Sequence, residues 1–311
     1  DRAPGADAAG IHDAGNEQAS IPPSRSPATT PQWAVVPQRP MPAASTRARR
    51  LEWAALDAAR PEPGVVIDWA TLGSSLNNFT FSGTNTYHVT GETFLSGTTT
   101  LEGGTVVKFA PYSSTLTALN ISGPVVCLTS PYRPAVFTAD ADNSIGEPIV
   151  GGSPNTGIEY AWTALRIEPG AGAVLLEHLR IRHAFQGLYL QGITPGITVR
   201  HSQFLRCRYP IVSKDTTPVR LKNVLFDSVP NPGVVLYGLD TPFHGEHLTV
   251  HNAPHLVVAG TLNLTNSLVV AVNGSLNYSG PGNFQAASAA GLFQSVGAGN
   301  QIGRASCRER V

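Results

Sequence analysis

The sequence predicts an all-β protein whose folded part is a single-stranded parallel β-helix with three strands per coil, behind a disordered N-terminal segment. Three observations carry this prediction: short β-branched runs broken by Gly and Ser, a motif that returns about once per coil, and a low content of charge. Charged residues make up 14% of the chain, and Gly and Pro number 31 and 25. This composition is typical of many short strands joined by tight turns.

The two ends of the chain are set apart from this pattern. Residues 1–62 are rich in Ala, Pro, Arg and Ser, and such a segment buries too little apolar surface to offset the entropy of ordering it. We expect a disordered leader or linker there, with one short helix over residues 50–59. The last residues, IGRASCRERV, resemble the translation of a sequencing adapter. We therefore expect residues 301–311 to be an artefact and the β-helix, residues 63–300, to be truncated.

A repeated motif defines the coils. Five segments align without gaps: LEHLRI, VRHSQF, LKNVLF, GEHLTV and LTNSLV. Their third residues are spaced by 23, 22, 24 and 19 positions, about the length of one coil with three strands and three turns. These third residues form a column of His and Asn: His178, His201, Asn223, His247 and Asn266.

Two inward-facing columns follow from this register, because side chains of a strand alternate between its two faces. The first column lies directly after the His/Asn column, and the second lies two residues further on. Thr-Pro pairs mark a further corner before a strand at Thr194-Pro195, Thr217-Pro218 and Thr241-Pro242. The inward columns contain Leu179, Ser202, Val224, Leu248 and Ser267, and then Ile181, Phe204, Phe226, Val250 and Val269.

The His/Asn column is predicted to be a structural ladder rather than a site. A polar side chain at the same tight corner of every coil can bond to the coil below, and Asn tolerates the left-handed backbone of such a corner. Buried polar groups need partners, and a ladder supplies them. A functional role for the column is the alternative.

The sequence pattern of residues 85–280 resembles that of a known superfamily. ETFLSGTTTLEGGTVVKF, the short coil that ends in Cys127, and PYRPAVFTADADNSIGE are similar to secreted β-helix proteins of environmental bacteria within the pectate-lyase-like superfamily. The resemblance implies a right-handed helix and an extracellular or cell-surface location. It leaves two functions open: a non-catalytic structural, adhesive or polysaccharide-binding protein, or a polysaccharide lyase or glycoside hydrolase whose site is only partly contained in this chain.

One loop offers a candidate metal site. In DADNSIGE, four oxygen-bearing side chains follow closely on one another, and calcium takes several oxygen ligands from a flexible loop. The Gly comes one place later than in an EF-hand loop, so a solvated polar loop is the alternative. The candidate calcium ligands are Asp140, Asp142, Ser144 and Glu147.

The same long loop and the strand after it offer a candidate glycan contact. Aromatic rings near the end of the loop, together with outward cations, suit an acidic polysaccharide. Alternatively, Trp162 covers the side of the solenoid, and the cations belong to ordinary charge pairs such as Glu177 with Arg200 and Lys222 with Glu246. The candidate contacts are Tyr160, Trp162, Arg180 and Arg182, with Glu159 beside them.

Other classes of function find little support. The 21 basic and 21 acidic residues give no basic bias towards nucleic acid, and no apolar stretch is long enough to span a membrane. Cys127 and Cys207 are expected to be small buried hydrophobes, and the cluster His244, His247, His251 and His255 lacks the spacing of a zinc motif. No nucleophile elbow, phosphate loop or pair of clustered carboxylates is found, so we expect no catalytic residue and no cofactor other than calcium. Oligomers are expected only through association of open sheet edges.

Overall fold

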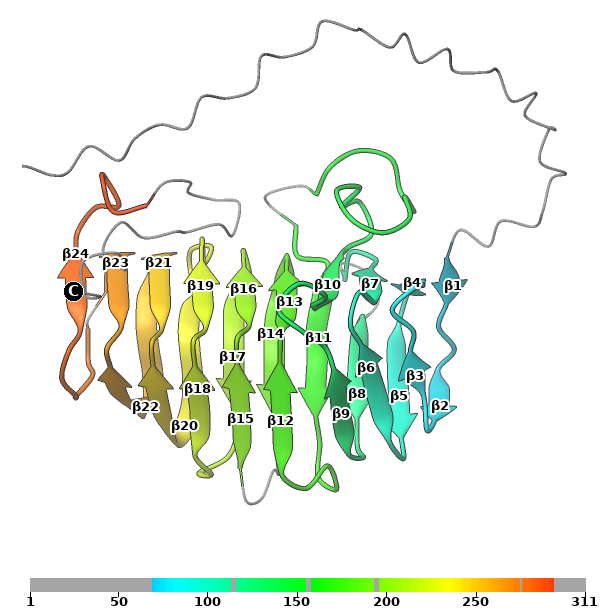
Figure 1. Ribbon diagram of the computed structural model, residues 1–311, viewed down its shortest axis with the longest axis horizontal. Helices are drawn as coiled ribbons and strands as arrows, with labels where there is room; N and C mark the ends of the chain where they lie inside the picture. The colour runs from blue at the N-terminus through cyan, green and yellow to red at the C-terminus, as the bar shows by residue number, and fades with distance from the viewer. Residues whose placement is uncertain (1–68, 113–115, 155–157, 193–195, 275, 294–311) are drawn as a thin grey trace, which may run out of the picture. The chain divides into compact units, whose positions relative to one another are not determined.

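The computed structural model describes residues 69–112, 116–154, 158–192, 196–274 and 276–293, and these residues form β-strands and no helix (Figure 1). The chain divides into two compact units, residues 1–61 and 62–311, and all described residues belong to the second. The expected disordered leader, its short helix, the adapter-like end and the corner Thr194-Pro195 lie outside the described residues.

The strands wind through three faces in a fixed order, which confirms the predicted parallel β-helix with three strands per coil. Face A collects every third strand along most of the chain, and all its neighbours pair in parallel (Figure 1). Its strands, in spatial order, are β1 (Ala70–Thr71), β4 (Thr86–Val89), β7 (Val106–Phe109), β10 (Ala135–Ala139), β13 (Leu179–Arg182), β16 (Gln203–Leu205), β19 (Leu225–Asp227), β21 (Thr249–Ala253), β23 (Leu268–Val272) and β24 (Phe284–Ala286).

Faces B and C complete each coil. In the last two coils a single long strand bends from face B onto face C, with a register shift at the bend. Face B contains β2 (Ser75–Asn77), β5 (Glu92–Ser96), β8 (Ala118–Ile121), β11 (Ala161–Ile167), β14 (Ala184–Leu190), β17 (Tyr209–Ser213) and the first parts of β20 (Val234–Glu246) and β22 (His255–Thr265). Face C contains β3 (Thr80–Phe81), β6 (Thr99–Glu102), β9 (Val125–Leu128), β12 (Val174–Glu177), β15 (Ile197–Arg200), β18 (Val219–Lys222) and the second parts of β20 and β22.

The core lies inside the coils, and both predicted inward columns are buried in it. The second column supplies large side chains, and the rings of Phe204 and Phe226 stack 5.3 Å apart in successive coils. The first column contains two hydroxyls that are satisfied internally. Ser202 Oγ accepts a hydrogen bond from the amide of Leu179 at 3.1 Å, and Ser267 Oγ accepts one from Leu248 at 2.8 Å. A serine therefore fits the interior because it bonds to the backbone of the preceding coil.

The coils turn at corners with left-handed backbone. The five residues of the His/Asn column lie between faces C and A and have φ between 48° and 54°. A second set of left-handed residues, which the sequence pattern does not predict, lies at or next to the ends of the face A strands, where the chain turns towards face B. It contains His183, Arg206, Ser228, Asn252 and Ala271.

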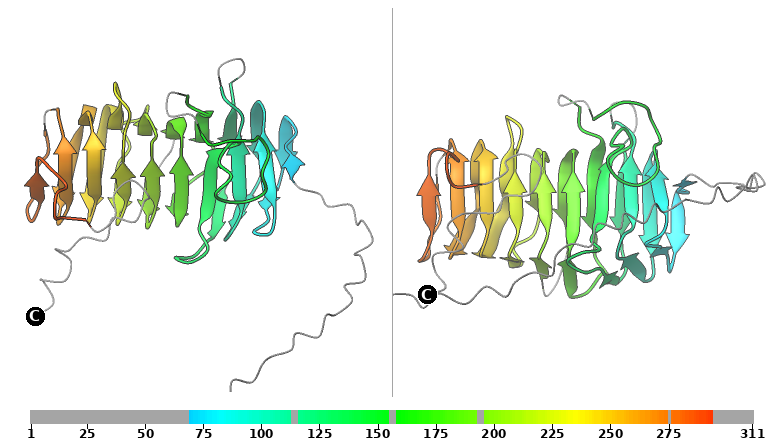
Figure 2. Two further views of the ribbon diagram at one scale, coloured as in Figure 1. Left: turned by 90° about the horizontal axis from the view of Figure 1, so that it is seen from above. Right: turned by 45° about the horizontal axis from the view of Figure 1, so that its top comes forward.

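One insertion interrupts the regular winding. Residues 140–160 leave the solenoid after β10 and return at β11, and the described part of this loop stands out from the coils in both figures (Figures 1 and 2). The loop passes over the outer surface of face A, because Lys108 on β7 donates hydrogen bonds to it. The loop covers face A at β7, where Lys108 lies.

Candidate functional site

The His/Asn column is a surface feature. The rings of His178 and His201 stack 5.1 Å apart with a 12° angle between their planes, and Asn223 Nδ2 lies 2.9 Å from His201 Nδ1. Partial burial lowers the pKa of His178, assisted by His201 and Arg200 and opposed by Glu177. His201, Asn223, His247 and Asn266 are exposed, so the corner geometry, and not the burial of polar groups, accounts for this column.

The predicted calcium loop forms an internal network instead of gathering ligands. Asp142 is buried, and its carboxylate accepts hydrogen bonds from Thr138 (2.7 Å) and Ser144 (2.5 Å) and pairs with Arg182 at 3.0 Å. Burial would raise the pKa of Asp142, but the hydrogen bonds from Ser144 and Thr138 and the charge of Arg182 together hold it below its ordinary value. The carboxylate is thus already supplied with donors.

A buried cation lies beneath the loop. Lys108 is fully buried, and its Nζ donates to the backbone oxygens of Asp142 (2.8 Å) and Glu147 (2.7 Å). Burial lowers the pKa of Lys108, while Asp142, Asp140 and Glu147 raise it. Among the described residues, no group of three or more His, Cys, Asp or Glu side chains is arranged to hold a metal ion. The expected ligands Asp140, Asp142, Ser144 and Glu147 therefore do not converge.

The predicted glycan contacts are separated from one another. Tyr160 is buried and Trp162 lies on face B, whereas Arg180 and Arg182 lie on face A. Both arginines are engaged, Arg180 with Gln203 at 2.9 Å and Arg182 with Asp142. These four residues do not form one patch.

Trp162 belongs to an aromatic column that the sequence pattern missed. Its ring stacks on Phe185 at 4.5 Å and 10°, so these two ring faces are used against each other rather than offered to a ligand. Arg208 lies over the Phe185 ring and pairs with Glu159 at 2.5 Å. The spacing between its members is irregular, at 50, 23, 24 and 28 residues, and this irregularity hides the column in the sequence. Its members are Tyr112, Trp162, Phe185, Tyr209 and Tyr237.

The outward charges do not form a single stripe. On face C, Arg200 pairs with Glu177 at 2.6 Å and Lys222 with Glu246 at 3.1 Å, which confirms the expected charge pairs. The other outward cations are spread over several faces: Arg180 and Arg182 lie on face A, Arg206 at a corner and Arg220 on face C.

The four clustered histidines are also dispersed. His251 is buried on face A with its Nδ1 2.7 Å from Asp227 Oδ1, and His247 occupies its corner. His244 and His255 are exposed on different faces. Cys127 and Cys207 are free, and burial raises the pKa of both thiols, that of Cys207 to about 12.

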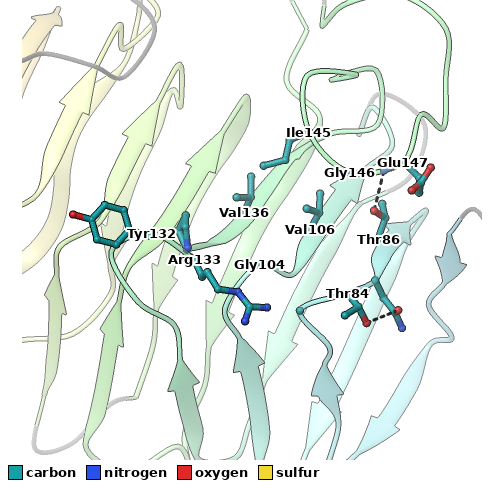
Figure 3. A pocket seen from close by; sticks show the side chains of 13 residues that line it. Thr84, Thr86, Gly104, Val106, Tyr132, Arg133, Val136, Ile145, Gly146 and Glu147 are labelled. Atoms are coloured by element: carbon teal, nitrogen blue, oxygen red, sulfur yellow. Dashed lines mark hydrogen bonds between the residues drawn. The ribbon is translucent and has the colours of Figure 1, made fainter. Parts of the chain in front are cut away.

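A pocket beside the loop combines residues that are far apart in the sequence (Figure 3). This corner pocket has a volume of about 320 Å³, and Val106, Val136 and Ile145 line it with apolar groups. Figure 3 shows Arg133 extending past Gly104 towards Thr84. Glu147 closes the pocket on the loop side, where its amide donates to Thr86 Oγ1 at 3.0 Å. Three coils and the loop thus contribute to one site.

Two further features set the chemistry of the corner pocket. Arg133 is exposed, and it has no acidic partner within 4 Å in the described part of the chain. Tyr132, at the rim, is 96% exposed. Gly83 leaves room for the Arg133 side chain. A Cβ at this position would lie 2.2 Å from the backbone oxygen of Gly103 and 3.1 Å from the Arg133 guanidinium. As far as the described residues go, the site therefore offers an unpaired cation and an aromatic ring around an apolar floor.

Comparisons of the chain with protein-family models, with curated proteins and with solved structures give no match. The fold therefore defines the class of protein, a parallel β-solenoid. Over the described residues, no helix has the length and apolar character needed to cross a bilayer.

Proposed function

We propose that the protein is a secreted or surface-attached, non-catalytic β-helix of the pectate-lyase-like kind that binds polysaccharide at the corner pocket. The observation that carries the proposal is the exposed Arg133 guanidinium, which has no acidic partner among the described residues, in a pocket with an apolar floor. Ligand pockets combine apolar lining with a few polar groups that fix orientation. Val106 and Val136 suit the C–H face of a sugar, and Arg133 and Thr84 suit its hydroxyl or carboxylate groups.

The enzymatic alternative is less favoured by the same pocket. A glycoside hydrolase of the common kind needs two carboxyl groups that flank the scissile bond. Glu147 is the acidic side chain that lines the corner pocket in the described part of the chain, and a second carboxyl group does not join it there. Binding without cleavage is the function that this set of side chains supports.

The test is a binding screen of the full chain against neutral and acidic glycans, followed by titration of the best ligand with variants. We expect Arg133→Gln and Tyr132→Ala each to weaken binding about tenfold, the effect of losing one charge-assisted hydrogen bond or one stacked ring. Arg206→Gln and Leu239→Ala remove a similar charge and an exposed apolar side chain outside the pocket lining, and should bind as the unmodified chain does. Unchanged affinity in both pocket variants would overturn the proposal. Cleavage of the glycan, seen as newly formed chain ends, would overturn it as well.

A further inference from the structure

A second groove lies on the outer surface of face C, away from the corner pocket. Four side chains lie in one line across successive strands there: Thr198 on β15, Arg220 on β18, His244 on β20 and Asn263 on β22. The strand register pairs Thr198 with Arg220, Arg220 with His244, and His244 with Asn263. Neighbouring strands are about 4.8 Å apart, so the line presents one polar side chain at each such step along the solenoid.

The surface along this line is hollowed. Two depressions of about 250 and 460 Å³ share Thr198 and Arg220, so together they form one groove. The groove runs from Leu175 on β12 to Asn263 on β22, a length of roughly 19 Å at the usual strand spacing. An elongated groove of this kind fits an extended polymer better than a single small ion.

The charge of the groove is positive at its centre. In the neighbouring column, Arg200 and Lys222 are already paired with glutamates at 2.6 Å and 3.1 Å. Arg220, in contrast, is exposed and has no acidic partner within 4 Å among the described residues. Its planar guanidinium has donors in a fixed fork that matches anionic oxygens. The groove therefore has one cation available to a ligand.

We propose that this groove binds a linear polysaccharide with anionic groups, laid along the axis of the solenoid. An anionic group lies against Arg220 and His244, and sugar hydroxyls contact Thr198 and Asn263. Single-stranded nucleic acid fits less well, since its bases stack best on large aromatic rings, and the described lining of this groove has no Phe, Tyr or Trp. The proposal concerns a site separate from the corner pocket and does not depend on it.

The test measures binding of the full chain to alginate, which has carboxylates, to dextran sulfate, and to uncharged dextran, with poly(dT) as the competing class. We expect binding to at least one of the two acidic polymers, little to dextran, and weakening as salt rises. Arg220→Gln should weaken binding about tenfold, and His244→Gln less. Both side chains are exposed, so the variants should keep the thermal stability of the parent chain, which a melting curve verifies.

Two matched variants separate the outcomes. Arg206→Gln removes the same charge outside the groove and should not affect binding to the acidic polymer, whereas Arg133→Gln tests the corner pocket alone. Loss with Arg133→Gln and none with Arg220→Gln would place the acidic polymer in the corner pocket and overturn the groove proposal. Equal or tighter binding of poly(dT), or equal loss with Arg206→Gln, would overturn it as well.

Discussion

Lys108 Nζ lies 2.8 Å from the backbone oxygen of Asp142, which joins a strand of face A to the loop that crosses it. Both residues are buried, and the second bond of Lys108, to the oxygen of Glu147, holds the wall of the corner pocket. Lys108 thus holds the loop to face A through two hydrogen bonds to its backbone.

Replacing Lys108 with Met should release this loop. The backbone oxygens of Asp142 and Glu147 lose their buried donor, and the Asp142 carboxylate loses a nearby positive charge. We therefore expect the free energy of unfolding to fall by about 3 kcal/mol. Chemical denaturation measures the loss, and limited proteolysis should show earlier cleavage between residues 143 and 154. Lys222→Met, on the surface of face C, serves as the control. Equal stability of the two variants would contradict the role assigned to Lys108.

Acid should destabilise the coil that contains His183. Burial lowers the pKa of this side chain to about 4, assisted by Arg182 and Arg206 and opposed by Asp142. The folded state therefore favours neutral His183, and its contribution is complete above the unfolded value near 6.5. As the pH falls from 6.5 to 4, the unfolded chain takes up a proton first, and about 3 kcal/mol is lost.

The variant His183→Asn isolates this effect in urea denaturation across that pH range. Asn tolerates the left-handed backbone at this position, φ 59°, and does not titrate. We expect the acid slope of stability to flatten relative to the unmodified chain, whatever the stability at neutral pH. An unchanged slope would assign the acid sensitivity to other groups.

The corner at His201 should accept Asn and reject Val. Its φ of 52° is left-handed, and a β-branched side chain is strained there by about 1–3 kcal/mol. We expect His201→Asn to unfold close to the parent chain and His201→Val to unfold at lower denaturant concentration. Equal midpoints for the two variants would mean that side-chain stacking with His178, and not the backbone, governs this corner.

Gly123 should be intolerant of any side chain. A Cβ at this position would lie 1.9 Å from the oxygen of Gly97 in the preceding coil. We expect Gly123→Ala to cost about 2 kcal/mol, because the two coils must move apart. Gly91→Ala is the matched control, since a Cβ there meets nothing within 4 Å. Thermal melts of the two proteins give the comparison directly.

The regular part of the fold could be predicted because one coil length and one two-residue alternation set it. The His/Asn column fixed the register, and the buried columns at Leu179 and Ile181 followed from strand geometry alone. The reason given for the column was incomplete, since burial was expected and most of its members are exposed.

The sites could not be predicted in the same way. The corner pocket brings together Thr84, Arg133 and Glu147, which belong to different coils and a loop, and no periodic pattern connects them. The acidic side chains of the loop offered either a calcium site or a solvated polar loop, and neither interpretation includes Lys108, which lies earlier in the sequence. The line through Arg220 and His244 could have been found from the aligned repeats, had exposed positions been compared as closely as buried ones.

The repeated corner at His178, His201 and Asn223 has a consequence for how this chain can change length. The coils that contain this corner, from His178 to Asn266, end in the same backbone conformation, so these coils are interchangeable parts. Deleting residues 201–222 would join Arg200 directly to Asn223. The chain would then turn at an equivalent corner, and the strands of the coils on either side would keep their register. Shorter insertions or deletions would break that alignment unless they leave the solenoid as a loop, as residues 140–160 do. The molecule is therefore suited to lengthening by duplication of whole coils.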